Sequence, residues 1–156
     1  MSGRLPEDKE QLFWKIFKET YNGPRYKDNK KYMMHGTTSV MDHCVNVAYT
    51  AYYMSYKLGI EVNEAELIRG ALLHDYFLYD WHEKSWANSI HGYTHPGKAL
   101  KNAKMDYYLS ATERDMIKHH MFPLTPRFPR SREGKILCAA DKLCAMKETV
   151  YGRIKK

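Results

Sequence analysis

Apolar residues recur along most of this chain at the three- and four-residue spacing of amphipathic helices, and alternating strand-like runs are scarce. The periodic segments begin near residues 7, 40, 64, 96, 111 and 132. Ser110 and Glu113 have the spacing of a capping box, and so do Asn63 and Glu66, while Gly59 indicates the end of the second helix. The pattern therefore predicts an all-α protein, a compact bundle of about five to seven helices.

The length of the chain predicts one domain. Its 156 residues are enough to bury a hydrophobic core without disulfide bonds. We expect residues 1–35 to form an N-terminal packing helix with a connection, and residues 36–148 to form the core that carries the candidate site. Three cysteines lie in apolar helical runs without CxxC spacing, which is typical of reduced core thiols: Cys44, Cys138 and Cys144.

The composition bears on partners and location. We find neither the apolar core of a signal peptide nor a run long enough to cross a bilayer, so we expect a cytoplasmic protein with no membrane partner. Lys and Arg outnumber Asp and Glu by 25 to 18, a formal net charge of +7, which favours an anionic partner such as a phosphorylated metabolite. Nucleic acid is possible but not favoured, because the basic residues are scattered and form no known binding motif. The oligomeric state is not predicted.

Acidic side chains interrupt two apolar helical faces. An adjacent His74-Asp75 pair ends one apolar segment, and Asp141 lies at helical spacing from Leu137 and Cys144 in another. Burying an ionised carboxylate is costly unless a cation or a set of donors compensates it. Imidazole nitrogen and carboxylate oxygen are ligands that divalent metals take readily. A capped helix end for the first pair, or a salt bridge with an arginine for Asp141, would satisfy the same groups.

Several further histidines accompany these acids. His43 lies on the apolar face of the second predicted helix, His95 at the start of a helix, and His119 and His120 at the end of another. A buried histidine is often only a hydrogen-bonded core residue, and histidines at a helix C-terminus complement the helix dipole. Each histidine alone therefore fits a structural role as well as a metal-binding one.

The order of these residues resembles the HD-domain superfamily of metal-dependent phosphohydrolases, over roughly residues 36–148. The resemblance implies a first metal site on a helical bundle, formed by His43, His74, Asp75 and Asp141. It also implies a second metal site, formed by Asp75, His95, His119 and His120. His91 competes with His95 for its place, and the HPGKAL context favours His95. Asp75 would bridge the two ions.

The resemblance further implies a hydrolase that cleaves a phosphomonoester or phosphodiester, with a nucleotide or another small phosphorylated molecule as substrate. Two nearby ions would activate water, and histidine-rich ligation favours iron, manganese, zinc or a related ion over magnesium. Asp80 or His82 could protonate the leaving group. These two residues lie in an aromatic segment, 76–92, that could form a wall of the substrate site or a packed loop. The candidate phosphate-binding cations are Lys98, Arg127, Arg130, Arg132 and Lys142.

The segment 121–135 follows the double histidine. It begins MFPLTP and lacks the EGYP-like signature of the cyclic-dinucleotide phosphodiesterases, which argues against such a substrate. Its three prolines stiffen the chain, and we expect it to present its arginines to the substrate; the alternative is a rigid surface connection. Two other functions are compatible with the same residues. One is an HD-like di-iron oxygenase, and the other is a non-catalytic nucleotide- or RNA-binding module with a structural metal site.

Overall fold

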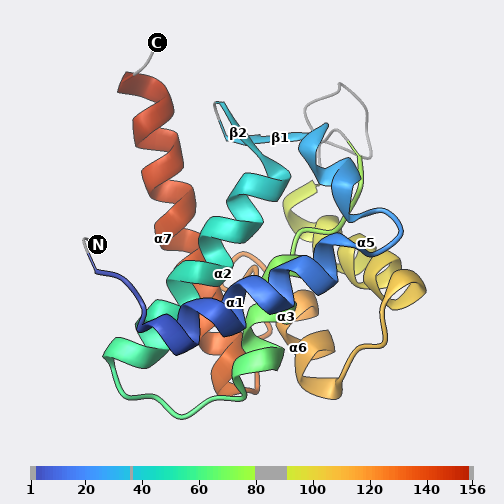
Figure 1. Ribbon diagram of the computed structural model, residues 1–156. Coiled ribbons are helices and arrows are strands. Elements are labelled where there is room, and N and C mark those ends of the chain that lie inside the picture. Colours follow the sequence, from blue (N-terminus) through green and yellow to red (C-terminus); the bar gives the residue numbers. More distant parts are fainter. Residues whose placement is uncertain (1–2, 36, 80–90, 155–156) are drawn as a thin grey trace.

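The computed structural model describes residues 3–35, 37–79 and 91–154 (Figure 1). The described residues contain six α-helices, one 3-10 helix and one short antiparallel sheet, which confirms the predicted all-α bundle. The elements are α1 (Glu7–Tyr21), η1 (Tyr26–Lys30), β1 (Met33–His35), β2 (Thr38–Ser39), α2 (Val40–Lys57), α3 (Glu64–Leu73), α5 (His91–Asp106), α6 (Ala111–His119) and α7 (Arg132–Ile154).

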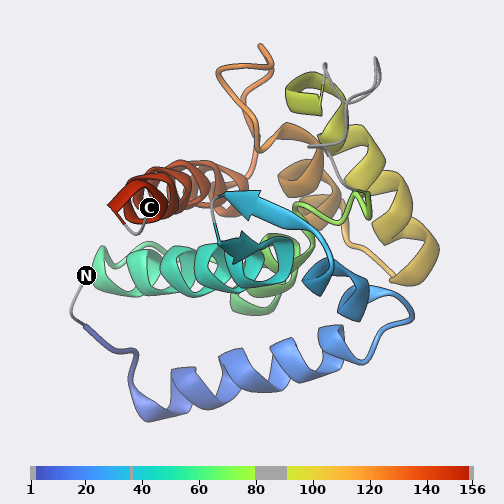
Figure 2. The same ribbon diagram turned by 90° about the horizontal axis from the view of Figure 1, so that it is seen from above.

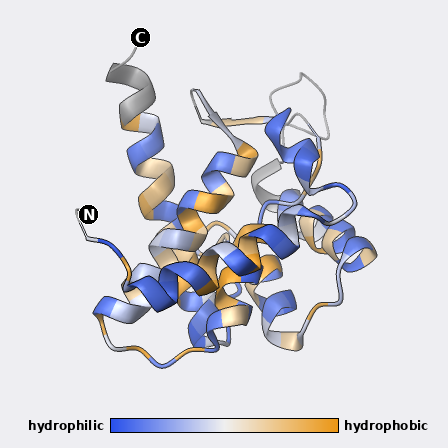
Figure 3. Ribbon diagram, in the orientation of Figure 1, coloured by the Kyte–Doolittle hydropathy of each residue, from blue (hydrophilic) through white to orange (hydrophobic). Residues whose placement is uncertain are grey.

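Helix α2 is central to the packing. It lies against both α3 and α7, and Figure 2 shows α2 and α7 running side by side. Helix α6 packs on α3, α5 and α7, while α1 covers α3. The core between these helices is fully buried at Val47, Leu67, Leu72, Met116 and Leu137. Hydrophobic positions alternate with hydrophilic ones along each helix, as expected for amphipathic helices with one face in the core (Figure 3).

Helix ends follow the sequence signals with one exception. Ser110 and Glu113 form the predicted capping box of α6, and the Asn63 side chain accepts a hydrogen bond from the Glu66 amide. Gly59 adopts φ +64°, the left-handed conformation that ends a helix. The predicted start of α5 near Pro96 is wrong, because the helix begins at His91 and includes the proline about one turn inside.

Two helices end at candidate ligands. Helix α3 ends at Leu73 with His74 as its C-cap, and α6 ends at His119 with His120 as its C-cap. At both ends the chain leaves the helix inside the bundle, since His74 and His120 are fully buried. None of the helices in the described ranges is both long and apolar enough to cross a membrane. Cys44, Cys138 and Cys144 are buried free thiols, as the sequence predicted.

Candidate metal centre

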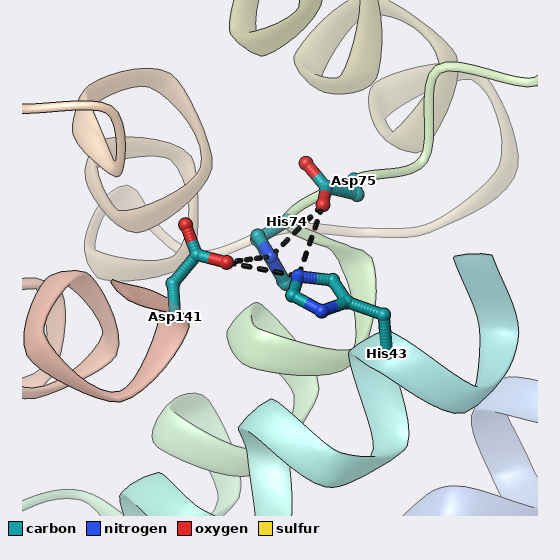
Figure 4. Close-up of side chains that lie close together, drawn as sticks. All are labelled: His43, His74, Asp75 and Asp141. Atoms are coloured by element: carbon teal, nitrogen blue, oxygen red, sulfur yellow. Dashed lines mark hydrogen bonds and ion pairs between the residues drawn. The ribbon is translucent and has the colours of Figure 1, made fainter. Parts of the chain in front are cut away.

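Four buried side chains from α2, α7 and the end of α3 meet at one point (Figure 4). The Nε2 atom of His43 lies 2.9 Å from Oδ1 of Asp141 and 3.5 Å from Oδ2 of Asp75. The Nε2 atom of His74 lies 3.2 Å from Oδ2 of Asp75 and 3.3 Å from Oδ1 of Asp141. Two nitrogens and two oxygens thus face a single small space, a donor set suited to a divalent metal ion.

A second group shares Asp75 with the first. Oδ1 of Asp75 lies 3.1 Å from Nε2 of His95 and 3.3 Å from Nε2 of His120, and the two imidazole nitrogens are 2.9 Å apart. All three side chains are buried. Asp75 therefore directs one carboxylate oxygen toward each group, so the two groups share this carboxylate.

The protonation of the rings tests whether a metal fits. Nδ1 of His74 lies 2.6 Å from the carbonyl oxygen of Ala71, and Nδ1 of His120 lies 2.8 Å from that of Ile117. A carbonyl can only accept, so Nδ1 donates in both rings, and in the neutral form Nε2 directs a lone pair at the carboxylate of Asp75. Such lone pairs repel a carboxylate unless a proton or a metal ion lies between them. The donor set therefore fits a metal.

The carboxylate of Asp75 also needs a positive charge beside it. Its Oδ1 atom is buried and has no hydrogen bond of acceptable geometry among the described residues, although His95 and His120 lie close to it. An ionised carboxylate oxygen left in this way is costly, and a cation at the shared point would compensate it.

Glu148, which the sequence motifs did not indicate, contacts the other ring nitrogen of His43. Its Oε2 atom accepts a hydrogen bond from Nδ1 of His43 at 2.8 Å, and its side chain is only 8% exposed. Such a bond fixes the imidazole so that Nε2 faces the centre. Glu148 follows Asp141 by two helical turns and so lies on the same face of α7. That spacing is the signal in the sequence that would have identified it.

Burial and charge act against each other at the first group. Burial disfavours the charged imidazole, but hydrogen bonds to Asp141 and Glu148 still hold the pKa of His43 well above its usual value. His74 behaves alike, because the charge of Asp75 outweighs burial and raises its pKa. Burial would raise the pKa values of Asp75 and Asp141, yet the charge of His74 holds both below the usual range. Both carboxylates therefore stay ionised at neutral pH.

His120 differs from the histidines of the first group. Burial is the dominant influence on its ring and lowers its pKa, although the nearby carboxylate of Asp75 opposes the shift. The ring is therefore neutral at neutral pH, and its Nε2 lone pair is available to a metal without release of a proton.

His119 departs from the predicted second set of ligands. Its Nδ1 atom lies 2.9 Å from Oδ1 of Asp115, and its buried Nε2 atom has no hydrogen-bond partner among the described residues. Adjacent helical residues point about 100° apart, so only His120, at the cap of α6, turns toward Asp75. His119 stays on the helical face of Asp115, one turn earlier.

Some of the remaining predicted site residues lie outside the part of the chain that the structure describes, and the others lie near the centre or on its surroundings. Asp80 and His82 lie outside the described residues, and so does the side chain of His91, whereas His95 is in the second group. The ammonium group of Lys142 lies 3.2 Å from the carbonyl oxygen of His120, so it caps the end of α6 beside the centre.

The other predicted cations lie at different places. Nζ of Lys98 lies 4.6 Å from the ring centroid of Tyr79. Arg132 donates a hydrogen bond to the backbone carbonyl of Glu61 at 3.3 Å. Arg127 and Arg130 line a hollow beside α6, together with His119 and Asp115.

The fold and the two groups define a helical bundle with a buried histidine and aspartate centre suited to metal ions. Residues 40–146, more than half of the chain, match the family model described as the HD domain. The chain therefore belongs to the HD domain family, which confirms the resemblance found in the sequence and indicates the superfamily of metal-dependent phosphohydrolases. Neither a curated protein nor a solved structure matched the chain.

Proposed function

We propose that this protein is a phosphohydrolase that binds two divalent metal ions and cleaves a nucleotide or another small phosphoester. The observation that carries the proposal is the position of Asp75 between two groups of histidines, one facing each of its oxygens. A protein that needed only a structural ion would not require both groups. The family supports the same reaction class.

The residues divide between the two sites as follows. The first site would be held by His43, His74, Asp75 and Asp141, and the second by Asp75, His95 and His120. When bound, such ions act as Lewis acids that activate water and polarise a phosphoryl oxygen. The backbone carbonyls that fix His74 and His120 keep both Nε2 atoms in place before any ligand arrives. Little side-chain ordering is then needed when metal and substrate bind.

The site also needs groups that handle the substrate's charge and the leaving group. We retain Lys98 and Lys142 as cations at the substrate, and Asp80 or His82 as the proton donor. Lys142 has the clearest structural support, because its Nζ atom contacts the carbonyl of His120 and also lies 3.1 Å from Sγ of Cys138. Arg132 is the weakest candidate, because its guanidinium is already bonded to the backbone carbonyl of Glu61.

A phosphoester screen with metal-loaded protein tests the proposal. Protein loaded separately with iron, manganese or zinc should release phosphate or a nucleotide product from at least one phosphoester, and Asp75→Asn should abolish the release. Asp42→Asn is the matched control, because this exposed acid lies next to His43 but outside both groups. Equal turnover by Asp75→Asn would refute the proposal. Intact nucleotide after incubation with every metal-loaded form would favour a binding module, and an oxygen-dependent optical change with iron would favour an oxygenase.

A further inference from the structure

A hollow of about 630 Å³ lies along α6, where its lining residues run from Ala111 to His119. It is bounded by α6 and by the segment 127–131, with Leu100 of α5 as part of its apolar wall. His119 lines the hollow, and the next residue, His120, belongs to the second ligand group. Since consecutive Cα atoms are about 3.8 Å apart, the hollow and the centre are close neighbours.

The walls of the hollow carry excess positive charge. Arg114, Lys118, Arg127 and Arg130 line it with exposed side chains, and none of the four forms an ion pair within the described parts of the chain. Asp115 is the acid among the described lining residues. Four cationic side chains less one carboxylate leave three formal positive charges around a small space.

Asp115 is bonded to other groups and forms no ion pair with these four cations among the described residues. Its Oδ1 atom pairs with His119, and its Oδ2 atom accepts from the amides of Arg130 and Ser131, at 3.1 and 3.3 Å, and from the Ser131 hydroxyl at 3.2 Å. These bonds tie the proline-containing segment to α6 and hold Arg130 at the hollow. Arg130 is thus presented on a fixed backbone, which lowers the entropy lost when a ligand binds.

We infer that the hollow binds the anionic group of a phosphorylated small molecule. Guanidinium groups bind phosphate oxygens through two parallel hydrogen bonds, and the volume is that of a small-ligand site. Two sources fit this chemistry: a second anionic group of the substrate, which rests on the proposed function, or a separate anionic effector, which does not. Leu100 and Ala111 provide apolar surface for the rest of either ligand.

Binding of inorganic phosphate to metal-free protein tests this inference without any turnover. Titration calorimetry at low and high salt should show salt-sensitive binding that Arg127→Ala and Arg130→Ala each weaken by about fivefold or more. Arg132→Ala is the matched control, since it removes the same charge two residues after Arg130, at a side chain that does not line the hollow. The inference is overturned if wild-type protein does not bind phosphate, or if Arg132→Ala weakens binding as much as the other two.

Kinetics on the metal-loaded protein then separates the two sources. If the anion belongs to the substrate, Arg130→Ala should lower kcat/KM about fivefold more for a nucleoside bisphosphate than for the corresponding monophosphate. Equal kcat/KM ratios, together with weakened phosphate binding, assign the hollow to an effector. A protein that binds phosphate in the hollow but hydrolyses no ester refutes the proposed function and leaves this site in place.

An independent observation concerns Glu148. The carboxylate of this residue is almost fully buried, one oxygen is bonded to Nδ1 of His43, and the other, Oε1, has no hydrogen-bond partner among the described residues. Burying a carboxylate with an unpaired oxygen is costly, and the one bond that Glu148 makes acts through the imidazole on the group at the far side of the ring. That group is Nε2 of the same ring, which faces Asp141 at 2.9 Å.

We propose that Glu148 is a positioning residue, which orients His43 and raises its basicity toward the first metal. Glu148→Ala should weaken binding of Co²⁺ about tenfold or more and change its visible absorption spectrum. Glu148→Gln, which keeps an oxygen acceptor but loses the charge, should restore the spectrum and part of the affinity. This rescue also covers the case in which the alanine variant does not fold.

Glu133→Ala is the control for Glu148→Ala. Glu133 is also a hydrogen-bonded acid on α7, but it accepts from the Asn63 amide at 2.8 Å, far along the helix from Glu148. It should leave the affinity for Co²⁺ unchanged. Wild-type affinity and spectrum in a folded Glu148→Ala variant, or an equal loss in Glu133→Ala, would overturn the assignment.

Discussion

The imidazole of His43 on α2 lies 2.9 Å from the carboxylate of Asp141 on α7, although 98 residues separate them in sequence. The contact depends on the close packing of α2 against α7, which places the first and the last ligand of the centre together. The candidate metal site is therefore a product of the whole bundle, and it should form only when the helices are docked. Metal binding and stability are coupled in such a protein.

The first prediction follows from this coupling. Adding Zn²⁺ should raise the melting temperature of wild-type protein, because metal binds the folded state. Asp141→Asn should lose most of this increase, since it removes a charged ligand of the first group. Differential scanning calorimetry measures the effect, with Asp42→Asn as a control that keeps the increase. An undiminished increase in Asp141→Asn would place the metal elsewhere.

The second prediction distinguishes the two adjacent histidines. His120→Ala should remove the second ion, because its Nε2 atom faces Asp75, whereas His119→Ala should leave the number of bound ions unchanged. Titration with Co²⁺, followed by absorbance, counts the ions in each variant. Loss of one ion in His119→Ala would show that this side chain turns toward the centre when metal binds, with Asp115 as its orienting partner.

The third prediction concerns pH. The pKa values of His43 and His74 are raised in the folded protein, and metal must displace their protons. Zn²⁺ affinity should therefore fall as pH is lowered through neutrality, with release of protons on binding. Calorimetry in buffers of different ionisation enthalpy measures the proton count. Binding without proton release at neutral pH would contradict the assignment of these two ligands.

The same shifts determine how the metal-free protein responds to pH. A raised folded pKa contributes stability that is fully present below the unfolded value of about 6.5 and is lost as pH rises through the folded value. The lowered pKa values of Asp75 and Asp141 contribute stability above about 3.9 that is lost as pH falls through the folded values. The gain in melting temperature from metal should thus increase from pH 6 to pH 8.

The fourth prediction concerns the ion pair that joins α3 to α6, the two helices that end at His74 and His120. Glu113 in α6 is buried and forms an ion pair with Arg69 of α3, in which Nη2 lies 2.6 Å from Oε1. Glu113→Ala should destabilise the protein by about 2 kcal/mol, because it removes both this ion pair, discounted for its partly exposed arginine, and the capping box of α6. Urea denaturation measures the loss. A change below about 0.5 kcal/mol would show that the pair is not a main link between these helices.

Much of the helical fold was predictable because local signals determine it. The capping box at Ser110, the stop at Gly59 and the periodic apolar faces are readable from neighbouring residues. The adjacent His74 and Asp75, and Asp141 further along the chain, were likewise visible as polar residues on apolar helical faces.

The parts that were missed depend on contacts between distant segments. The direction of His119 depends on where α6 ends and on Asp115, which the segment at Arg130 and Ser131 also holds. Glu148 reaches His43 only because α7 packs beside α2. The first turn of α5 precedes a proline that local rules place at a helix start. The helical spacing of Glu148 from Asp141 is the one signal of these that short-range periodicity carries, and the contacts themselves require the folded chain.

The number of metal ions bound per chain tests the central claim most directly. Elemental analysis of wild-type protein saturated with Zn²⁺ or Mn²⁺ and passed through a desalting column should give two ions per chain. Asp75→Ala should give less than one, since both groups lose a shared charged ligand. A wild-type value that stays at one under saturating metal, or an unchanged value in Asp75→Ala, would contradict a centre in which Asp75 joins two ions.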